Sequence, residues 1–327
     1  MLPTRQSATL KALGKIEGFK NDLNMLKSTL ADLSLWLPAI PLEKQCDEAM
    51  RMVDSIAERF ERKLVVTIVG PCGAGKSTLL NALAGIDDLS PAGHQRPTTS
   101  HVIIFSSDTQ NAGQLVANLG SDSVEVKSSP AAELLEHVLI IDTPDTDSMA
   151  YRKHATLVRE AIARSDMLLC VFDSENPKRK DHVDFMAPFI RRFNGESLVI
   201  VINKCDRQDE TELKKRILPD FSAYIQAAWQ TSVDGALCVS ARRHLKDPQW
   251  DQTAGPKHDF DQFKELQNLI FDNINRAGYV VDRRLENARS LRDFIFDQAG
   301  QEVSGYSTSL VTAKQKDLTP LDIDIRV

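Results

Sequence analysis

A glycine-rich segment that follows an apolar run of strand length constrains the fold of this chain more than any other feature. Residues 64–69 read LVVTIV, residues 70–77 read GPCGAGKS, and a helix-like stretch, TLLNALAG, comes next. Strand, G-x-x-x-x-G-K-S and helix in this order form the pattern of a phosphate-binding loop. Glycines allow backbone angles that turn successive N–H groups towards a phosphate, and the helix N-terminus adds a partial positive charge. The sequence therefore predicts a site for a nucleoside triphosphate.

The loop residues have distinct expected roles. Lys76 is predicted to bridge the β- and γ-phosphates, and the Ser77 hydroxyl is predicted to bind Mg²⁺. A glycine-rich turn that binds nothing is the alternative interpretation, and the strand and helix on either side argue against it. The residues expected to surround the phosphates are Gly70, Pro71, Cys72, Gly73, Ala74, Gly75, Lys76, Ser77 and Thr78.

Further apolar runs follow this loop. Between residues 64 and 245, the runs HVIIF, HVLIID, MLLCVFD, SLVIVIN and ALCVS are separated by helix-like stretches. Apolar runs without a period of two are typical of strands covered on both faces, as in a mostly parallel sheet. Alternation of strand and helix then predicts an α/β fold with a doubly wound sheet. The polar segment 107–137 is expected to form an extra hairpin.

Helical patterns lie on both sides of this region. Residues 7–62 carry apolar residues three and four positions apart on either side of LPAIP, which predicts a helical hairpin interrupted by prolines. The pattern becomes helical again from residue 258. The two helical blocks either meet as one bundle or pad the sheet separately. The predicted division is 1–62 as hairpin, 63–250 as nucleotide-binding domain, 251–312 as C-terminal helices and 313–327 as tail or linker.

Composition excludes several classes of protein. Lys and Arg number 40 against 46 Asp and Glu, a net charge of −6, which disfavours binding to nucleic acid through a broad basic field. The 5 cysteines are scattered without a C-x-x-C pair, which favours a reducing compartment over a disulfide framework or a zinc site. No signal-peptide core is present, and no run approaches the roughly 18 apolar residues of a membrane span. We expect a cytoplasmic protein without a transmembrane segment.

A second motif indicates which base is bound. Asn203, Lys204, Cys205 and Asp206 form N-K-x-D at the end of an apolar run. The Asp206 carboxylate can accept two hydrogen bonds from guanine, through N1–H and the N2 amino group, whereas adenine offers neither donor. Lys204 is expected to lie along the base, and Asn203 to tie this loop to the phosphate loop. Guanine is therefore the predicted base.

Three shorter signals agree with a guanine nucleotide and Mg²⁺. Ser240 and Ala241 follow the next apolar run, where a backbone N–H is expected to contact guanine O6. Asp142 ends HVLIID, where its carboxylate is expected to hold Mg²⁺ through a water. Thr98 and Thr99 precede HVIIF, and one of their hydroxyls is expected to close onto Mg²⁺ when a γ-phosphate is present. The predicted metal ligands are Ser77, Thr99 and Asp142.

These motifs, in this order and spacing, resemble those of P-loop GTPases of the translation-factor-related class, and within it the Era-like and dynamin-like branch. RPTTSH at 96–101 is similar to the P-T-T of bacterial dynamin-like proteins and the T-T-R of Era-like ones. On that pattern the resemblance implies Thr99 as the Mg²⁺-sensing threonine, with Thr98 as the alternative. It also implies binding of GTP and GDP, Mg²⁺-dependent hydrolysis of GTP and a nucleotide-dependent change of conformation.

The resemblance extends to partners through the flanking helices. A bundle made by them would resemble the neck of dynamin-like proteins, which would carry movement to a membrane, to a second protomer or to another partner. The expected partners are GTP, a second copy through the GTPase domain, and a membrane surface or protein through the helices. Specific nucleic-acid binding is not expected.

The third motif of the family departs from its pattern here. D-x-x-G is replaced by Asp142, Thr143, Pro144 and Asp145, so an aspartate stands where the glycine N–H meets the γ-phosphate. The Asp145 carboxylate is expected to point away from the phosphates, because like charges would repel. Gly73 also occupies the position of a catalytic serine in dynamins.

No glutamine follows the third motif to orient a water molecule. Hydrolysis is therefore expected to be slow, or to depend on His94, Arg96, Asp145 or a charge supplied by a partner. The predicted catalytic residues are Lys76, Thr99 and Asp145. Two other interpretations stay open: a GTP- or GDP-binding regulatory module with negligible hydrolysis that signals through a partner, and an ATPase of another P-loop class.

Overall fold

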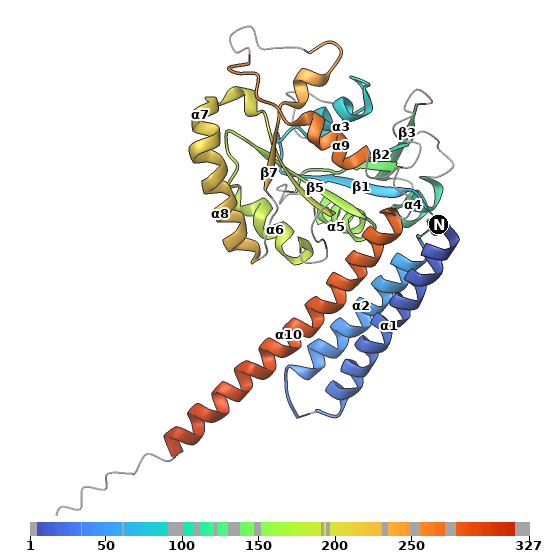
Figure 1. The fold of residues 1–327 in the computed structure, drawn as a ribbon, viewed down its shortest axis with the longest axis vertical. Helices are drawn as coiled ribbons and strands as arrows, with labels where there is room; N and C mark the ends of the chain where they lie inside the picture. Colours follow the sequence, from blue (N-terminus) through green and yellow to red (C-terminus); the bar gives the residue numbers. More distant parts are fainter. Residues whose placement is uncertain are drawn as a thin grey trace, which may run out of the picture.

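The sheet has seven strands in the order β3-β2-β4-β1-β5-β6-β7. It lies at the centre of the upper part of the molecule in Figure 1. The strands are β1 (Leu64–Val69), β2 (Val102–Ser106), β3 (Val124–Ser128), β4 (Val138–Asp142), β5 (Met167–Asp173), β6 (Leu198–Asn203) and β7 (Ala236–Val239). The computed structural model describes residues 5–33, 35–60, 62–90, 101–106, 112–120, 123–129, 138–146, 152–190, 193, 197–230, 235–248, 256–271 and 279–317.

The sheet is parallel with one exception. β4, β1, β5, β6 and β7 run in the same direction, whereas β2 pairs antiparallel with β4 and carries β3 parallel to itself. Every residue of β1, β2 and β4 is buried, as expected for strands that have helices on both faces. The mostly parallel, doubly wound sheet predicted from the apolar runs is confirmed.

Helices cover both faces of the sheet. On one face, α3 (Lys76–Ala84) and α9 (Phe263–Phe271) pack on alternate residues of β1, such as Val66 and Ile68. On the other face lie α4 (Gly113–Leu119), α5 (Arg152–Ala163), α6 (Lys180–Ile190) and α8 (Leu218–Trp229), with Val65 and Val69 beneath them. The short α7 (Glu210–Glu212) and one turn of π-helix at 213–217 lead into α8. The alternation of side chains along β1 thus serves two separate cores.

The hairpin expected between residues 107 and 137 is not what the described part of this segment forms. It contains a helix, α4, and an edge strand, β3, which is parallel to β2 rather than antiparallel as a hairpin would require. Three of the five residues of β3 are only partly buried and two are exposed. Apolar Leu115, Leu119 and Val116 of α4 pack against β2 and β4 instead, which explains why helix was preferred there.

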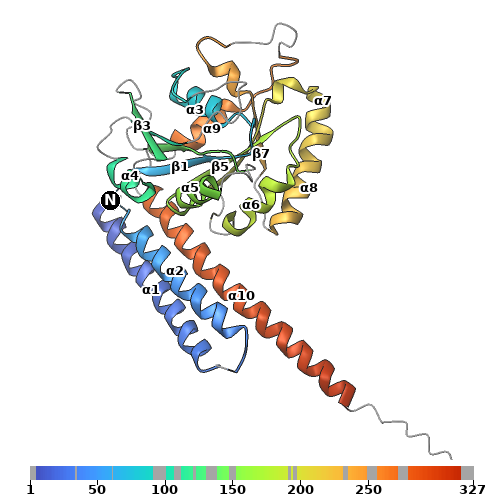
Figure 2. The same cartoon turned by 180° about the vertical axis from the view of Figure 1, so that it is seen from behind.

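The N-terminal hairpin and the last helix form a bundle of three helices that runs away from the sheet (Figures 1 and 2). It consists of α1 (Arg5–Ala31), α2 (Ala39–Ala57) and α10 (Tyr279–Asp317), with a core of its own that includes Leu23, Val53 and Leu285. Both alternatives for the flanking blocks are therefore realised, because α9 pads the sheet while α10 joins the hairpin.

Two helix boundaries differ from the expectation. α2 begins at Ala39, so Pro41 lies inside its first turn, where the missing N–H costs no helical hydrogen bond. α10 continues to Asp317, so residues 313–317, expected in the tail, are helical. None of the helices among the described residues is both long and apolar enough to cross a membrane. The division of the chain at residues 62, 250 and 312 stays a prediction.

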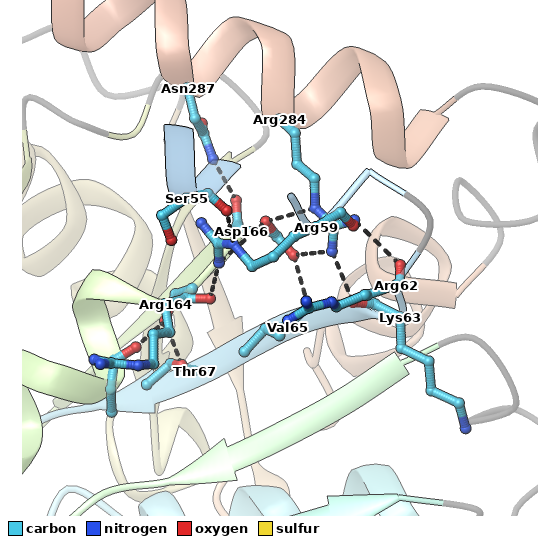
Figure 3. A network of polar contacts seen from close by, with 12 residues as sticks. Ser55, Arg59, Arg62, Lys63, Val65, Thr67, Arg164, Asp166, Arg284 and Asn287 are labelled. Atoms are coloured by element: carbon cyan, nitrogen blue, oxygen red, sulfur yellow. Dashed lines mark hydrogen bonds and ion pairs between the residues drawn. The ribbon is translucent and has the colours of Figure 1, made fainter. Parts of the chain in front are cut away.

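A buried cluster of charges joins the bundle to the sheet (Figure 3). Asp166, which precedes β5, accepts hydrogen bonds from Arg284 of α10 at 2.9 and 2.7 Å and from the Val65 backbone N–H at 2.9 Å. Arg284 also donates to the carbonyls of Arg59, Arg62 and Lys63, which lie between α2 and β1. We call Asp166, Arg284 and Arg59 the joint.

The joint is closed to solvent. The side chain of Arg284 is 0% exposed and that of Asp166 is 1% exposed. Burial alone would raise the pKa of Asp166, but the charges of Arg284 and Arg59 and the hydrogen bonds outweigh it and hold that pKa below its usual value. This cluster therefore links the bundle to the N-terminal ends of β1 and β5.

Candidate nucleotide-binding site

The phosphate loop, residues 70–77, has the backbone geometry that its glycines predict. Gly73 and Gly75 have φ values of +79° and +88°, in the left-handed region that favours glycine. A Cβ atom at position 75 would lie 2.3 Å from Asn203 Nδ2, so this position requires glycine for space as well. α3 begins at Lys76, and the N–H groups of its first turn are unsatisfied within the helix. The loop and helix end are therefore arranged to receive an anion.

Lys76 is buried beneath the loop rather than extended into solvent. Its side chain is 5% exposed, and Nζ donates to the carbonyls of Gly70 at 3.0 Å and Pro71 at 3.3 Å. Nζ also pairs with Asp145 Oδ1 at 2.6 Å. The expectation that the Asp145 carboxylate points away from the phosphate site is therefore wrong for this structure. A buried ammonium group requires a counter-charge, and Asp145 supplies it.

Asp142 lies next to the first turn of α3. Its Oδ2 accepts hydrogen bonds from Ser77 Oγ at 2.7 Å and from Ser90 Oγ at 2.8 Å. Its Oδ1 is buried and has no hydrogen-bond partner among the described residues. Complete burial raises the pKa of Asp142, with a further contribution from the negative charge of Asp145. The ionised form of Asp142 therefore has too little positive charge around it to compensate for its burial.

A bound Mg²⁺ ion would supply the positive charge that Asp142 lacks. A hydroxyl and a carboxylate oxygen are ligands that Mg²⁺ accepts, directly or through water. Ser77 and Asp142 bring these two oxygens within hydrogen-bond distance of each other. No cluster of three or more His, Cys, Asp or Glu side chains in the described part of the chain is placed to hold a metal ion. The fit is thus to an ion that takes its remaining ligands from nucleotide phosphates and water.

The side chain of Asn203 links the phosphate loop to the loops expected to bind the base. Nδ2 donates to the carbonyl oxygens of Ala74 at 2.9 Å and Gly75 at 3.4 Å. Oδ1 accepts from the backbone N–H groups of Lys204 at 2.9 Å and Ala241 at 3.1 Å. One side chain at the end of β6 therefore fixes the phosphate loop relative to both base loops, residues 203–206 and 240–241.

The base loops are ordered by side-chain contacts. Asp206 is 4% exposed and its Oδ1 accepts from Ser240 Oγ at 2.5 Å. Lys204 has a φ of +62°, and its Nζ pairs with Asp173 Oδ2 at 2.5 Å. This ion pair stretches the aliphatic part of Lys204 from β6 to the end of β5, where it can support a planar base.

A buried histidine lies behind the segment that follows Asp142. His182 of α6 is 0% exposed, and its Nδ1 lies 2.8 Å from Thr146 Oγ1. Thr146 in turn donates its backbone N–H to the Gly70 carbonyl at 3.3 Å. Burial, with the positive charge of Lys76 adding to it, lowers the pKa of His182 to about 3. The ring is therefore neutral and anchors the residue next to Asp145.

The structure brings the predicted phosphate, base and Asp142 residues into one region, at the C-terminal ends of β1, β4, β6 and β7. Thr98 and Thr99, with His94 and Arg96, lie outside the described residues. Sequence reasoning missed Ser90, His182 and Asp173. Asp173 ends the apolar run MLLCVFD, so the strand-end argument used for Asp142 could have found it. Ser90 and His182 belong to no local pattern.

The cysteines separate into two environments. Cys46, Cys170, Cys205 and Cys238 are buried, and burial raises the pKa of each thiol, to about 11 for Cys46 and about 12 for Cys238. Cys72, in the phosphate loop, is partly exposed. Thiols with raised pKa values are poor nucleophiles at neutral pH.

Comparison with known families agrees with this geometry. Residues 65–204 match the family model described as 50S ribosome-binding GTPase. Residues 65–204 are thus similar to a GTPase domain of the P-loop type. The matched segment is less than half of the chain, and it runs from β1 to Lys204, so that Asp206, Ser240 and the helical bundle lie outside it. No curated protein matches the sequence closely.

Solved structures with a similar arrangement include GTPases of bacteria. The chain is 17% identical to a structure of an oligomerised bacterial dynamin pair that senses and tethers membranes, covering 92% of this chain and 51% of that one (TM-score 0.46). The chain is 14% identical to the LeoA bacterial dynamin GTPase from ETEC, covering 93% of this chain and 50% of that one (TM-score 0.43).

Era, in complex with MgGDPNP and part of 16S ribosomal RNA, is 21% identical, with coverage of 55% of this chain and 52% of that one (TM-score 0.38). The chain spans about half the length of each of these three structures. At this level of identity the similarity concerns the fold alone.

Proposed function

We propose that this chain binds GTP and GDP with Mg²⁺, hydrolyses GTP, and changes conformation between the two nucleotide states. The family of residues 65–204 supports guanine-nucleotide binding. The observation that carries the proposal is the position of Asn203, whose side chain joins the phosphate loop at Ala74 to the base loop at Ala241. Such a link keeps the phosphate loop and the base loop at a fixed separation, as the binding of one ligand with both a phosphate group and a base requires.

The chain's own residues divide the work. Loop N–H groups and Lys76 hold the phosphates, and the Asp206 carboxylate accepts from guanine N1–H and N2. Ser77 and Asp142 would hold Mg²⁺, which would neutralise charge between the β- and γ-phosphates. Thr99 is proposed as the residue that responds to the γ-phosphate, and Asp145 as a residue that governs the hydrolytic step.

A regulatory module with negligible hydrolysis is the second candidate function. The ion pair of Lys76 with Asp145 favours it, because the lysine expected at the γ-phosphate is already neutralised. In this candidate the nucleotide state is communicated to a partner and phosphate release is not required.

The proposed partners are a second copy of the chain, through the GTPase domain, and a membrane surface or protein, through the bundle. Support for a contact at the bundle comes from the connection between α1 and α2, where Leu35 is 97% exposed and Leu37 is 82% exposed. Phosphate release per molecule that rises with protein concentration would support pairing of GTPase domains. A cytoplasmic location, with contact to a membrane surface, belongs to the same proposal.

The base-reading part of the proposal is tested with Asp206→Asn. The amide can donate to xanthine O2, where guanine carries a donor, so affinity should move from guanine to xanthine nucleotides by tenfold or more, about 1.4 kcal/mol or more. Titration calorimetry with GDP and xanthosine diphosphate, both with Mg²⁺, measures the change. Asp220→Asn, an exposed carboxylate on α8, is the matched control and should leave both affinities unchanged.

Lys76→Ala tests the assignment of the phosphate loop. This variant should lose measurable affinity for GTP, and normal phosphate release from it would refute the assignment of the phosphate loop. In the unaltered protein, GTP binding with phosphate release favours the GTPase, whereas binding without release favours the regulatory module. Guanine selectivity that survives in Asp206→Asn would exclude the proposed base pocket.

A further inference from the structure

We propose that Asp145 is a specificity-determining residue that favours binding of GDP over binding of GTP. Its carboxylate pairs with Lys76, and the γ-phosphate of GTP would otherwise bind that lysine. The inference rests on the proposed function, since it concerns the same nucleotide site. Its starting point is the ion pair between Lys76 Nζ and Asp145 Oδ1, at 2.6 Å, with side chains only 5% and 9% exposed.

The hydrogen-bonding capacity of Lys76 is already used. An ammonium group has three N–H donors. Nζ of Lys76 has three acceptors within reach, the Gly70 and Pro71 carbonyls and the Asp145 carboxylate. A phosphate oxygen that binds Lys76 must therefore displace one of them. Asp145 is the only one of the three that carries a charge, so it is the one that competes directly with a phosphate.

The balance of charge at the site gives the direction of the effect. Asp145 pairs with the buried ammonium group of Lys76, and a second carboxylate, Asp142, is bound to the adjacent Ser77 and keeps Oδ1 without a partner in the described part of the chain. The γ-phosphate adds further negative charge beside Asp145, whereas GDP brings none at that position. The β-phosphate, which both nucleotides have, is expected to be held mainly by the loop N–H groups. GDP therefore competes less with Asp145 for Lys76 than GTP does.

The backbone around Asp145 is held on both sides. Thr143 Oγ1, two residues before it, donates to the Ile68 carbonyl at 2.9 Å. Thr146, directly after it, is bound to the Gly70 carbonyl and to the buried ring of His182. GTP must therefore either rotate the Asp145 side chain out of a buried ion pair or break these contacts. Both costs are larger for GTP than for GDP, because only GTP has a γ-phosphate beside Asp145.

The test compares two nucleotides on three proteins. Dissociation constants for GDP and for the non-hydrolysable analogue GMPPNP are measured by titration calorimetry with Mg²⁺ on the unaltered chain, Asp145→Asn and Asp145→Gly. Asparagine keeps the size and removes the charge, and glycine restores the residue that the family motif has. Both variants should raise the affinity for GMPPNP relative to GDP by tenfold or more. Asp181→Asn, a carboxylate on α6 that pairs with Arg179 near the surface, is the control and should leave the ratio unchanged.

Each outcome decides between the two levels of the proposal. The role of Asp145 would be overturned if the ratio of the dissociation constants for GMPPNP and GDP in both variants stays within twofold of the ratio in the unaltered chain. Binding of GDP would in that case leave the proposed function standing. Absence of binding by either nucleotide to the unaltered chain would overturn the proposed function and this inference together. Thermal unfolding of each variant identifies one that has failed to fold, and the other variant then carries the test.

Discussion

Two buried clusters of charge lie at opposite ends of β1, and they differ in how completely their carboxylates are hydrogen-bonded. At the joint, each carboxylate oxygen of Asp166 accepts a hydrogen bond, and its pKa is held below the usual value (Figure 3). In the nucleotide site, Asp142 keeps a buried oxygen without a partner in the described part of the chain, and its pKa is raised. A buried charge that is fully paired serves the fold, whereas one left incomplete indicates a place for a ligand.

The largest expected effect comes from breaking the joint. Asp166→Ala removes the carboxylate that pairs with both Arg284 and Arg59 and leaves two buried guanidinium groups without it. Removal of one partner of a buried ion pair costs about 3–5 kcal/mol. Urea unfolding followed by circular dichroism measures the loss. A change below about 1 kcal/mol would mean that the joint does not hold the bundle to the sheet.

Acid should weaken the nucleotide site before it weakens the joint. The pKa of His182 in the folded chain is about 3, below its ordinary value of 6.5, so the unfolded chain binds a proton that the folded chain excludes. The contribution of His182 to stability is complete above pH 6.5 and is lost as the pH falls towards 3. Between pH 7 and pH 5 the loss is about 2 kcal/mol.

Urea unfolding at pH 7 and pH 5, on the unaltered chain and on His182→Asn, isolates this contribution. The variant should lack the part of the pH dependence that is due to His182. Its free energy of unfolding should therefore change less between pH 7 and pH 5 than that of the unaltered chain. Equal changes in the two proteins would contradict the assignment. Asp166, whose folded pKa is lowered from 3.8, contributes stability above that value and loses it only below it, so the joint should be unaffected at pH 5.

The smallest effect is expected from an exposed ion pair of the bundle. Lys20 of α1 pairs with Asp54 of α2 at 2.8 Å, but their side chains are 30% and 52% exposed. Water screens such a pair, and exposed pairs contribute up to about 1 kcal/mol. Lys20→Met keeps the aliphatic stem and should therefore change the free energy of unfolding by less than that, in the same assay. A loss as large as that of Asp166→Ala would remove the distinction between the joint and an ordinary ion pair.

Local motifs made the phosphate loop and the base loops predictable from sequence. In these loops the residues that act together are close in the chain or follow the ends of parallel strands, so spacing alone indicates their position. Even the link from Asn203 to the phosphate loop was expected on this basis, and its two hydrogen bonds to the loop carbonyls agree with it.

Contacts between distant segments were not predictable. Arg284 meets Asp166 across 118 positions, and no local pattern marks either residue. The orientation of Asp145 was predicted from repulsion by phosphates, but burial of Lys76 without a compensating charge costs more, and that cost is visible only once the side chains are packed. The α4–β3 segment was misjudged because its polar residues obscured the apolar side of α4, which includes Leu115 and Leu119.

The unequal environments of the cysteines have a practical consequence. Four thiols are enclosed with raised pKa values, while Cys72 lies in the loop expected to wrap around the diphosphate. A mild alkylating reagent should therefore attach first at that loop, and a bound nucleotide would shield the sulfur from it. The rate of labelling then becomes a gauge of occupancy that needs neither a radioactive nor a fluorescent ligand.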